Sequence, residues 1–270
     1  MVAEKIPIAL TIAGSDPGGG AGIQADLKTF HQFGIFGTSV IAALTAQNTK
    51  GVFGVQTVPG EFVRAQLSAL AGDLPPAALK SGMLATEEII EEVADFIEAE
   101  RWGTRYVFDP VMVATSGHRL LEPDAEAALR ERLLPLAAIV TPNLDEAEIL
   151  VGHPVRDPAA MERAGTALLA LGAGAALIKG GHLKGTTLVD ILVTPTGAQR
   201  FERPRIATTS THGTGCTLSA AITAGLALGR PLERSVADAL DFVARAIAAA
   251  PGLGAGHGPL NHFVEPRAKS

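Results

Sequence analysis

Near its C-terminal end the chain reads Thr208-Thr209-Ser210-Thr211-His212-Gly213-Thr214-Gly215-Cys216-Thr217-Leu218-Ser219-Ala220-Ala221. Two glycines flank Thr214, and the Ala-rich apolar run that follows predicts a helix reaching Gly229. The backbone N–H groups of residues 213–216 would then open this helix without intrahelical partners, a geometry that favours a phosphate or a developing oxyanion. The segment therefore predicts an anion site.

Cys216 falls in the first turn of this predicted helix. There the positive end of the helix dipole is expected to lower the pKa of a thiol below its free value of about 8.5, which makes a thiolate base a candidate. The alternative is that Cys216 is a small buried hydrophobic side chain, as a single cysteine before an apolar helix most often is. This segment alone leaves both interpretations open.

The composition and length allow an enzyme and exclude several other classes of protein. With 270 residues, 47% of them hydrophobic, the chain can bury the core of one α/β domain. The formal net charge of -6, with 22 basic residues scattered along the chain, argues against a nucleic-acid partner. One cysteine allows no intrachain disulfide and suits a reducing compartment. Because no apolar run is long and unbroken enough to span a bilayer, we expect no membrane partner and a cytoplasmic location.

Short β-like runs alternate with helical patterns along almost the whole chain. This alternation predicts a single α/β domain over residues 1–270, with a mostly parallel sheet and helices on both faces. The predicted strands are 6–14, 38–47, 78–84, 106–112, 138–143 and 175–178, followed by a hairpin of 187–193 and 199–206. The predicted helices end near 33, cover 61–70, begin after a cap at 86, cover 124–134, begin at 144, and cover 159–171 and 232–249.

The familiar nucleotide-binding loops fit this sequence poorly. No lysine directly follows a glycine, so a Walker A loop is absent. Gly20-Ala21-Gly22-Ile23-Gln24-Ala25 fits the dinucleotide pattern G-x-G-x-x-A after a predicted strand, but the next strand ends without an acidic residue for the ribose hydroxyls. This disfavours NAD. The seven histidines show no H-E-x-x-H pattern and there is no second cysteine, so a zinc site is not expected.

Polar residues follow several predicted strands at their carboxyl ends, where open α/β sheets bind ligands. They are Gln47 and Asn48, Asp109, Asn143 with Glu146, and Lys179. Lys179 directly follows four apolar residues, so we interpret it as a cation near transferred phosphates. Asn143-x-x-Glu146 fits a capping box and equally a site for hydrated Mg²⁺ beside a phosphate. Asp109 fits a turn with the following proline and equally a metal ligand.

Six segments spread along the chain match the pattern of one enzyme family. They are Gly14-Ser15-Asp16-Pro17-Gly18-Gly19-Gly20-Ala21-Gly22-Ile23-Gln24-Ala25-Asp26-Leu27-Lys28-Thr29-Phe30, Ala46-Gln47-Asn48-Thr49, Ser81-Gly82-Met83-Leu84, Thr141-Pro142-Asn143-x-x-Glu146, Lys179-Gly180-Gly181-His182 and Thr211-His212-Gly213-Thr214-Gly215-Cys216-Thr217. In this order they resemble the hydroxymethylpyrimidine/phosphomethylpyrimidine kinases of thiamine biosynthesis, within the ribokinase superfamily. The resemblance implies a ribokinase-like fold without a lid subdomain, and a homodimer.

The resemblance also implies roles for single residues. Gln47 would read the aminopyrimidine, because a carboxamide can donate to a ring nitrogen and accept from an amino group. The residues implied around the ring are Ala21, Asp26, Met83 and Val111. Those implied at the anion hole are Gly213, Thr214, Gly215 and Cys216, with Cys216 as the base in place of the Asp of most ribokinase relatives. Those implied for ATP phosphates are Lys179, Asn143, Glu146 and Thr211, with Asp109 and Glu146 as Mg²⁺ ligands.

The implied activity is an ATP- and Mg²⁺-dependent phosphorylation of 4-amino-5-hydroxymethyl-2-methylpyrimidine and then of its monophosphate. The alcohol of the first step needs a base, whereas a phosphate monoester, with a pKa of about 6, is already mostly ionised at pH 7. We therefore expect Cys216 to matter far more for the first step. One alternative is a pyridoxal or pyridoxine kinase of the same fold, which Gln47 and Met83 disfavour. Another is a non-catalytic pyrimidine- or NAD-binding regulator, against which the anion turn argues.

Overall fold

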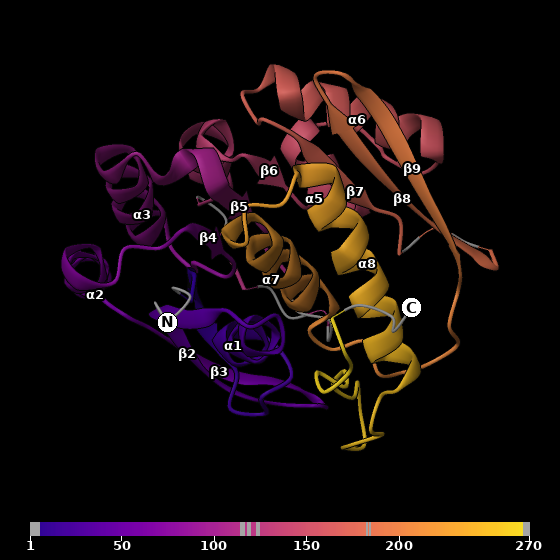
Figure 1. Ribbon diagram of the computed structural model, residues 1–270, viewed down its shortest axis with the longest axis horizontal. Coiled ribbons are helices and arrows are strands. Elements are labelled where there is room, and N and C mark those ends of the chain that lie inside the picture. Colours follow the sequence, from indigo (N-terminus) through magenta and orange to yellow (C-terminus); the bar gives the residue numbers. More distant parts are fainter. Residues whose placement is uncertain are drawn as a thin grey trace, which may run out of the picture.

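Apolar runs bounded by glycine loops form the centre of the molecule, and they assemble into one nine-stranded sheet of order β3-β2-β1-β4-β5-β6-β7-β8-β9 (Figure 1). The computed structural model describes residues 6–113, 117, 120–122, 125–181, 183 and 185–266. The strands are β1 (Ile8–Ser15), β2 (Phe36–Asn48), β3 (Gly51–Thr57), β4 (Ala78–Ser81), β5 (Tyr106–Phe108), β6 (Ile139–Val140), β7 (Ala176–Lys179), β8 (Thr187–Thr194) and β9 (Gly197–Pro204). In the sheet, β2, β1, β4, β5, β6 and β7 run parallel to their neighbours. β3 pairs antiparallel with β2, β8 with β7, and β9 with β8.

Helices cover both faces of the sheet, as Figure 1 shows. One face packs against α2 (Gly60–Asp73), α3 (Glu87–Glu100), α4 (Ala125–Ala128), α5 (Leu144–Val151) and α6 (Pro158–Ala170). The other packs against α1 (Gly22–Gln32), α7 (Thr214–Ala227) and α8 (Leu232–Ala248). Along β1, Leu10 and Ile12 pack into the core beneath α2–α6, and Ala9 packs into the core beneath α1, α7 and α8. Side chains of a strand alternate between its two faces. The predicted two-sided α/β architecture is confirmed.

Most predicted elements are present with ends shifted by a few residues. The predicted cap at Thr86 is confirmed, since its side chain accepts a hydrogen bond of 3.3 Å from the Ile89 amide. The hairpin is β8–β9. The predicted helix over 124–134 is a composite of α4, a π-helical turn (Leu129–Leu133) and a 3₁₀ turn (Leu134–Leu136), and its first residue lies outside the described residues. A further 3₁₀ turn, Trp102–Arg105, leads into β5.

Strand β3 was not predicted. It pairs with the end of β2 at the edge of the sheet, and its side chains are mostly exposed, with Phe53 70% accessible. An edge strand with little burial lacks the apolar alternation by which strands are recognised.

The start of α7 is fixed by a close backbone approach. Gly213, which caps this helix, has φ of 79°, and a Cβ there would collide with the carbonyl oxygen of Gly20. Only glycine tolerates both conditions. The glycine loop that precedes α1 and the turn that precedes α7 are therefore pressed together at the carboxyl edge of the sheet. Each described helix is too short or too polar to span a bilayer.

Candidate active site

Three charged side chains predicted from separate strand ends meet at one point. Lys179 is the last residue of β7, and its Nζ lies 3.1 Å from Oδ1 of Asp109, which follows β5. The same Nζ lies 3.8 Å from Oε2 of Glu146 in the first turn of α5. Because β5, β6 and β7 are parallel neighbours, their carboxyl ends share one edge and bring these side chains together.

Asp109 is an ionised carboxylate held by several donors. It is 1% exposed, and besides Lys179 it accepts hydrogen bonds from the hydroxyls of Thr141, at 3.1 Å, and Ser219, at 3.2 Å. Burial alone would raise its pKa, but the charges of Lys179 and Lys80 hold the pKa of Asp109 below its ordinary value. The carboxylate is therefore charged at neutral pH.

Asn143 and Glu146 form the capping box that their spacing allowed. The Asn143 side chain accepts from the Glu146 amide at 2.9 Å, and Oε2 of Glu146 accepts from the Asn143 amide at 2.7 Å. Burial raises the pKa of Glu146 to about 7, against the opposing charge of Lys179. The cap accordingly places a titratable carboxylate beside Lys179, so the structural role does not remove it from the charged cluster.

The turn before α7 faces the Lys179–Asp109 pair. A Cβ built on Gly215 would lie 3.3 Å from Nζ of Lys179 and 3.7 Å from Oδ2 of Asp109. In α7 the Thr217 amide donates the first intrahelical hydrogen bond, to the Gly213 carbonyl. The amides of residues 215 and 216 therefore lie ahead of the helical hydrogen-bond pattern. The expectation that all four amides of residues 213–216 are unpaired is wrong, because the Thr214 amide donates to the Thr211 carbonyl at 3.3 Å. The Thr214 hydroxyl bonds to the same carbonyl.

Cys216 is partly buried between this turn and the glycine loop, where the Gly22 backbone bonds to its sulfur. Burial raises the pKa of the thiol to about 11, and the carboxylates of Asp26 and Asp109 act in the same direction while Lys80 opposes them. The lowered pKa expected from the helix dipole is therefore wrong for the free protein. Loss of water, reinforced by the two carboxylates, keeps the thiol protonated at neutral pH.

Lys80 is a charged residue of this region that the sequence patterns did not single out. It lies in β4 with 0% exposure, and its Nζ lies 2.9 Å from Oδ1 of Asp26, which is equally buried. The other oxygen of Asp26 accepts from the Thr11 hydroxyl at 2.6 Å. Asp26 is thus enclosed beneath the site with both oxygens bonded, and its contact with a substrate ring stays a prediction. A lone lysine inside an apolar strand is the signal that could have revealed this pair.

Gln47, at the end of β2, lies beside a second polar group. Its amide nitrogen is 3.1 Å from Nε2 of His212, and that ring nitrogen is 2.9 Å from Oδ2 of Asp16. Asp16 in turn accepts from three amides of the glycine loop, those of Gly18, Gly20 and Ala21. The family resemblance predicted Gln47 and Ala21 as substrate-binding residues. His212 and Asp16 were not predicted, because 196 residues separate these two partners.

The remaining predicted residues lie on apolar or surface positions. Met83 is buried with Ala43 and Ala85, and Val111 packs against this cluster. The Met83 sulfur would lie 3.1 Å from a Cβ at Gly14, which places the cluster beside the glycine loop. Thr211 lies in the turn before α7, with its hydroxyl 3.5 Å from Nδ1 of His257.

The donor set suits a metal ion that arrives with phosphates. Within the described ranges, no group of three or more His, Cys, Asp or Glu side chains is arranged to hold a metal. Mg²⁺ commonly takes one or two carboxylates and completes its shell with waters and substrate phosphates. Asp109 and Glu146, both within 4 Å of Lys179, are the two carboxylates here that would fit such a site.

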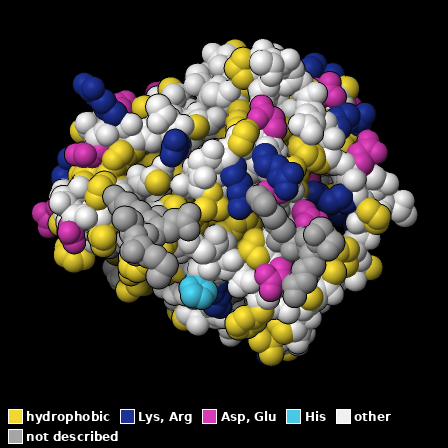
Figure 2. All heavy atoms as spheres, viewed as in Figure 1, with side chains coloured by type: hydrophobic (Ala, Val, Ile, Leu, Met, Phe, Trp, Pro, Cys, Tyr) yellow, Lys and Arg dark blue, Asp and Glu magenta, His cyan; other side chains and the backbone are white. Residues whose placement is uncertain are grey.

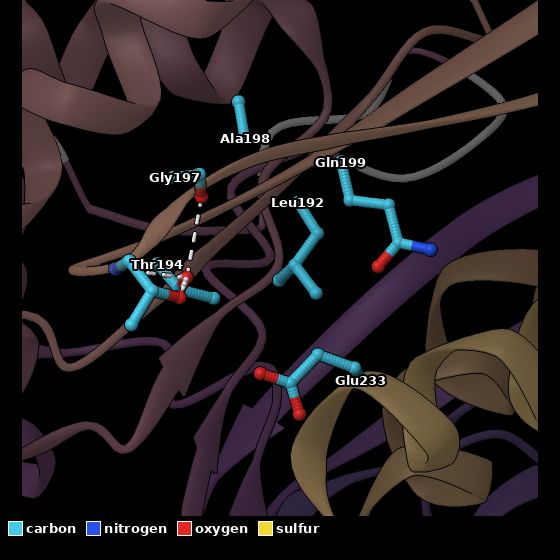
Figure 3. Close-up of a pocket in the computed structure, with 7 residues that line it drawn as sticks. Leu192, Thr194, Gly197, Ala198, Gln199 and Glu233 are labelled. Atoms are coloured by element: carbon cyan, nitrogen blue, oxygen red, sulfur yellow. Dashed lines mark hydrogen bonds between the residues drawn. The ribbon is translucent and has the colours of Figure 1, made fainter.

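A separate shallow pocket of about 170 Å³ lies between the β8–β9 hairpin and α8 (Figure 3). Its lining residues are Leu192, Thr194, Thr196, Gly197, Ala198, Gln199 and Glu233. None of them belongs to the groups above, and Glu233 is the one charged side chain among them. On the face drawn in Figure 2, Lys and Arg side chains lie among Asp and Glu side chains, so that face has no surface of a single sign.

Comparison with known proteins places the chain in a family. Residues 16–261 match the model of the phosphomethylpyrimidine kinase family. The chain belongs to this family. It is 53% identical over 259 residues to the hydroxymethylpyrimidine/phosphomethylpyrimidine kinase of Rhizobium meliloti, a match that covers 95% of this chain and 97% of that protein. Membership confirms the expected phosphotransferase activity, and a kinase of this family uses ATP.

Solved structures confirm the ribokinase-like fold of this phosphomethylpyrimidine kinase family member. The phosphomethylpyrimidine kinase of Clostridium difficile is 44% identical with a TM-score of 0.80, over 90% of this chain and 100% of that one. The pyridoxal kinase of Staphylococcus aureus in complex with AMP-PCP is 35% identical with a TM-score of 0.87, over 96% and 94%. The fold is thus shared by pyrimidine kinases and pyridoxal kinases.

Proposed function

We propose that this chain is a single-domain kinase that transfers the terminal phosphoryl group of ATP to 4-amino-5-hydroxymethyl-2-methylpyrimidine and then to the resulting monophosphate. The observation that carries the proposal is the position of Gly215 over the Lys179–Asp109 pair, with the Gln47 amide 3.1 Å from His212, three residues earlier in the same segment. In this proposal, amides and a cation for phosphate would lie next to a carboxamide for a heteroaromatic ring.

The charges of the site suit phosphoryl transfer. Catalysis of this reaction rests on positioning and on stabilising charge at the transferred group. Lys179, the amides of residues 215 and 216, and Thr211 would contact the phosphates of ATP. Asp109 and Glu146, with Asn143 fixing the latter, would hold Mg²⁺, which supplies positive charge to those phosphates when bound. The chain would act as a homodimer in the cytoplasm.

The ring would lie against the wall that Ala21, Met83 and Val111 provide, with Gln47 at its polar edge. Met83 and Val111 belong to one apolar cluster, so they exclude water without offering competing polar atoms. In the second phosphorylation the monophosphate already carries its negative oxygen, so the same residues need only hold it in line with ATP.

Cys216 would take the proton of the hydroxymethyl group in the first step. Because its pKa is about 11 in the free protein, the thiolate fraction at neutral pH is small and rises about tenfold per pH unit. The first phosphorylation should therefore accelerate far more between pH 7 and 9 than the second, because the two steps share only the ionisation of Glu146. Single-turnover rates of both steps across this range measure the difference.

Substitution of the thiol tests the same role. Cys216→Ala should slow the first step by about 10² to 10⁴, the usual worth of a general base, and leave the second within a few-fold. Cys216→Ser, which keeps the size of the side chain, is the matched control for packing. Equal losses in both steps would assign Cys216 a shaping role only.

Product analysis by mass tests the proposal as a whole. After incubation with ATP, Mg²⁺ and hydroxymethylpyrimidine, we expect the pyrimidine monophosphate followed by the diphosphate. Pyridoxal, tested in parallel, addresses the second candidate, which the fold shared with pyridoxal kinases favours. Faster consumption of pyridoxal would support that candidate, and binding of the pyrimidine without release of ADP would indicate a non-catalytic regulator.

A further inference from the structure

A chain of polar contacts links the glycine loop to Gln47 through one histidine. Nε2 of His212 lies 2.9 Å from Oδ2 of Asp16 and 3.1 Å from the amide nitrogen of Gln47. Asp16 is 3% exposed, and the His212 side chain is 13% exposed. One ring nitrogen therefore faces both a carboxylate and a carboxamide in a nearly closed setting.

The position of the ring proton follows from these two neighbours. Asp16 accepts from three loop amides. Burial works against its ionised form, but the hydrogen bonds from His212 and from the amides of Ala21 and Gly18 hold the pKa of Asp16 below its ordinary value. An ionised carboxylate can only accept hydrogen bonds. Nε2 of His212 must therefore carry a proton and donate it toward Asp16, because a bare nitrogen lone pair would face the carboxylate charge.

This proton decides the orientation of the Gln47 amide. A protonated Nε2 cannot accept a hydrogen bond from the amide nitrogen, so two N–H groups would oppose each other. The two ends of a carboxamide exchange places when the group turns over. The bonded arrangement turns Oε1 of Gln47 toward His212, where it shares the Nε2 proton with Asp16. The amide NH₂ then faces away from the histidine.

His212 itself has little freedom to move. Its backbone amide donates to the Gly258 carbonyl at 3.2 Å, and its backbone forms an isolated parallel β-bridge with Pro259. Its ring packs on the glycine loop so closely that a Cβ at Gly20 would lie 2.6 Å from Cδ2. The orientation that His212 imposes on Gln47 is thus set before any ligand arrives.

We propose that His212, anchored by Asp16, is a positioning residue that fixes the Gln47 amide with its NH₂ toward the ligand, so that the site selects a ring nitrogen acceptor beside an amino group. The NH₂ donates to the ring nitrogen, and the second lone pair of Oε1 accepts from the amino group. A ring with the reversed pattern, N–H beside a carbonyl, meets two mismatched contacts. The selectivity for the amino compound depends on the proposed function. The contacts that join Asp16, His212 and Gln47 do not depend on it.

The proton position is tested without any activity. Nitrogen-15 spectra of the histidine rings in the whole protein at pH 8 should show Nε2 of His212 protonated, with the signal assigned by its loss in His212→Gln. A proton found on Nδ1 and not on Nε2 would overturn the proposal.

The selectivity is tested by kcat/KM for two substrates, the aminopyrimidine and its analogue with an oxo group in place of the amino group. In His212→Leu, which frees the amide to turn over, the preference for the amino compound should fall about tenfold or more, the worth of one directed hydrogen bond. His212→Gln, whose own NH₂ can replace the Nε2 proton, should keep the preference within about threefold.

The outcomes separate the two levels of the proposal. An unchanged preference in an active His212→Leu protein would overturn the positioning role, since a merely structural role alters both substrates alike. A wild-type protein that phosphorylates neither pyrimidine would contradict the proposed function. The position of the His212 proton would then still test whether His212 orients the Gln47 amide.

Discussion

Lys80 and Lys179 are both paired with an aspartate near the same edge of the sheet, yet one pair is sealed and the other is open. The Lys80–Asp26 pair has 0% exposure on both side chains, and Asp26 is completed by Thr11. Lys179 is 15% exposed, touches two carboxylates, and faces the turn at Gly215. In the sealed pair the loss of one partner would leave a buried charge, whereas the open pair leaves Lys179 partly accessible, as our proposed phosphate site requires.

The largest expected effect concerns the sealed pair. Lys80→Met leaves the Asp26 carboxylate buried without its cation, so we expect the free energy of unfolding to fall by about 3–5 kcal/mol. The double variant Lys80→Met, Asp26→Leu removes both charges and should recover most of this loss. Urea unfolding curves measure both. A single variant within about 1 kcal/mol of the wild type would show that the pair is not sealed in solution.

Lys179→Met should separate activity from stability. Removing one preorganised donor to transition-state charge costs about 10² to 10³ in kcat. The cost in unfolding free energy should be smaller than for Lys80→Met, because Thr141 and Ser219 still donate to Asp109. Steady-state kinetics and urea unfolding on the same sample test this. A fully active Lys179→Met protein would remove Lys179 from the phosphate site.

Gly215→Ala has the smallest expected effect. Its Cβ would enter the space over Lys179, and we expect about a tenfold loss in kcat because the phosphate must shift. Stability should stay within about 1 kcal/mol of the wild type, because the gain from the better helix former is offset by a 3.3 Å approach to Nζ of Lys179, which two carboxylates hold. Gly225→Ala, in the same helix, is the contrasting control. Its added Cβ would collide with the Ser235 side chain, so we expect this variant to lose stability.

Local patterns were enough for most of the fold. The apolar run after Cys216, the cap at Thr86 and the capping box at Asn143 each depend on residues close in sequence, and all three are present. The convergence of Asp109, Lys179 and Glu146 followed from one topological rule about strand ends. These features need no knowledge of distant partners.

The misses share a different cause. Lys80 gains its meaning from Asp26, which is 54 residues away, and His212 gains its meaning from Asp16. The pKa of Cys216 depends on burial among carboxylates that come from other elements, so the helix dipole alone predicted the wrong direction. Long-range electrostatics is absent from local sequence patterns.

A crystal structure of the protein with Mg²⁺ and a non-hydrolysable ATP analogue tests the central claim most directly. We expect the terminal phosphate within hydrogen-bond distance of Nζ of Lys179 and of the Gly215 amide, with the Lys80–Asp26 pair unchanged. Phosphates bound elsewhere, for example in the pocket beside Glu233, with Lys179 still bonded only to Asp109 and Glu146, would contradict the assignment of the open pair to phosphoryl transfer.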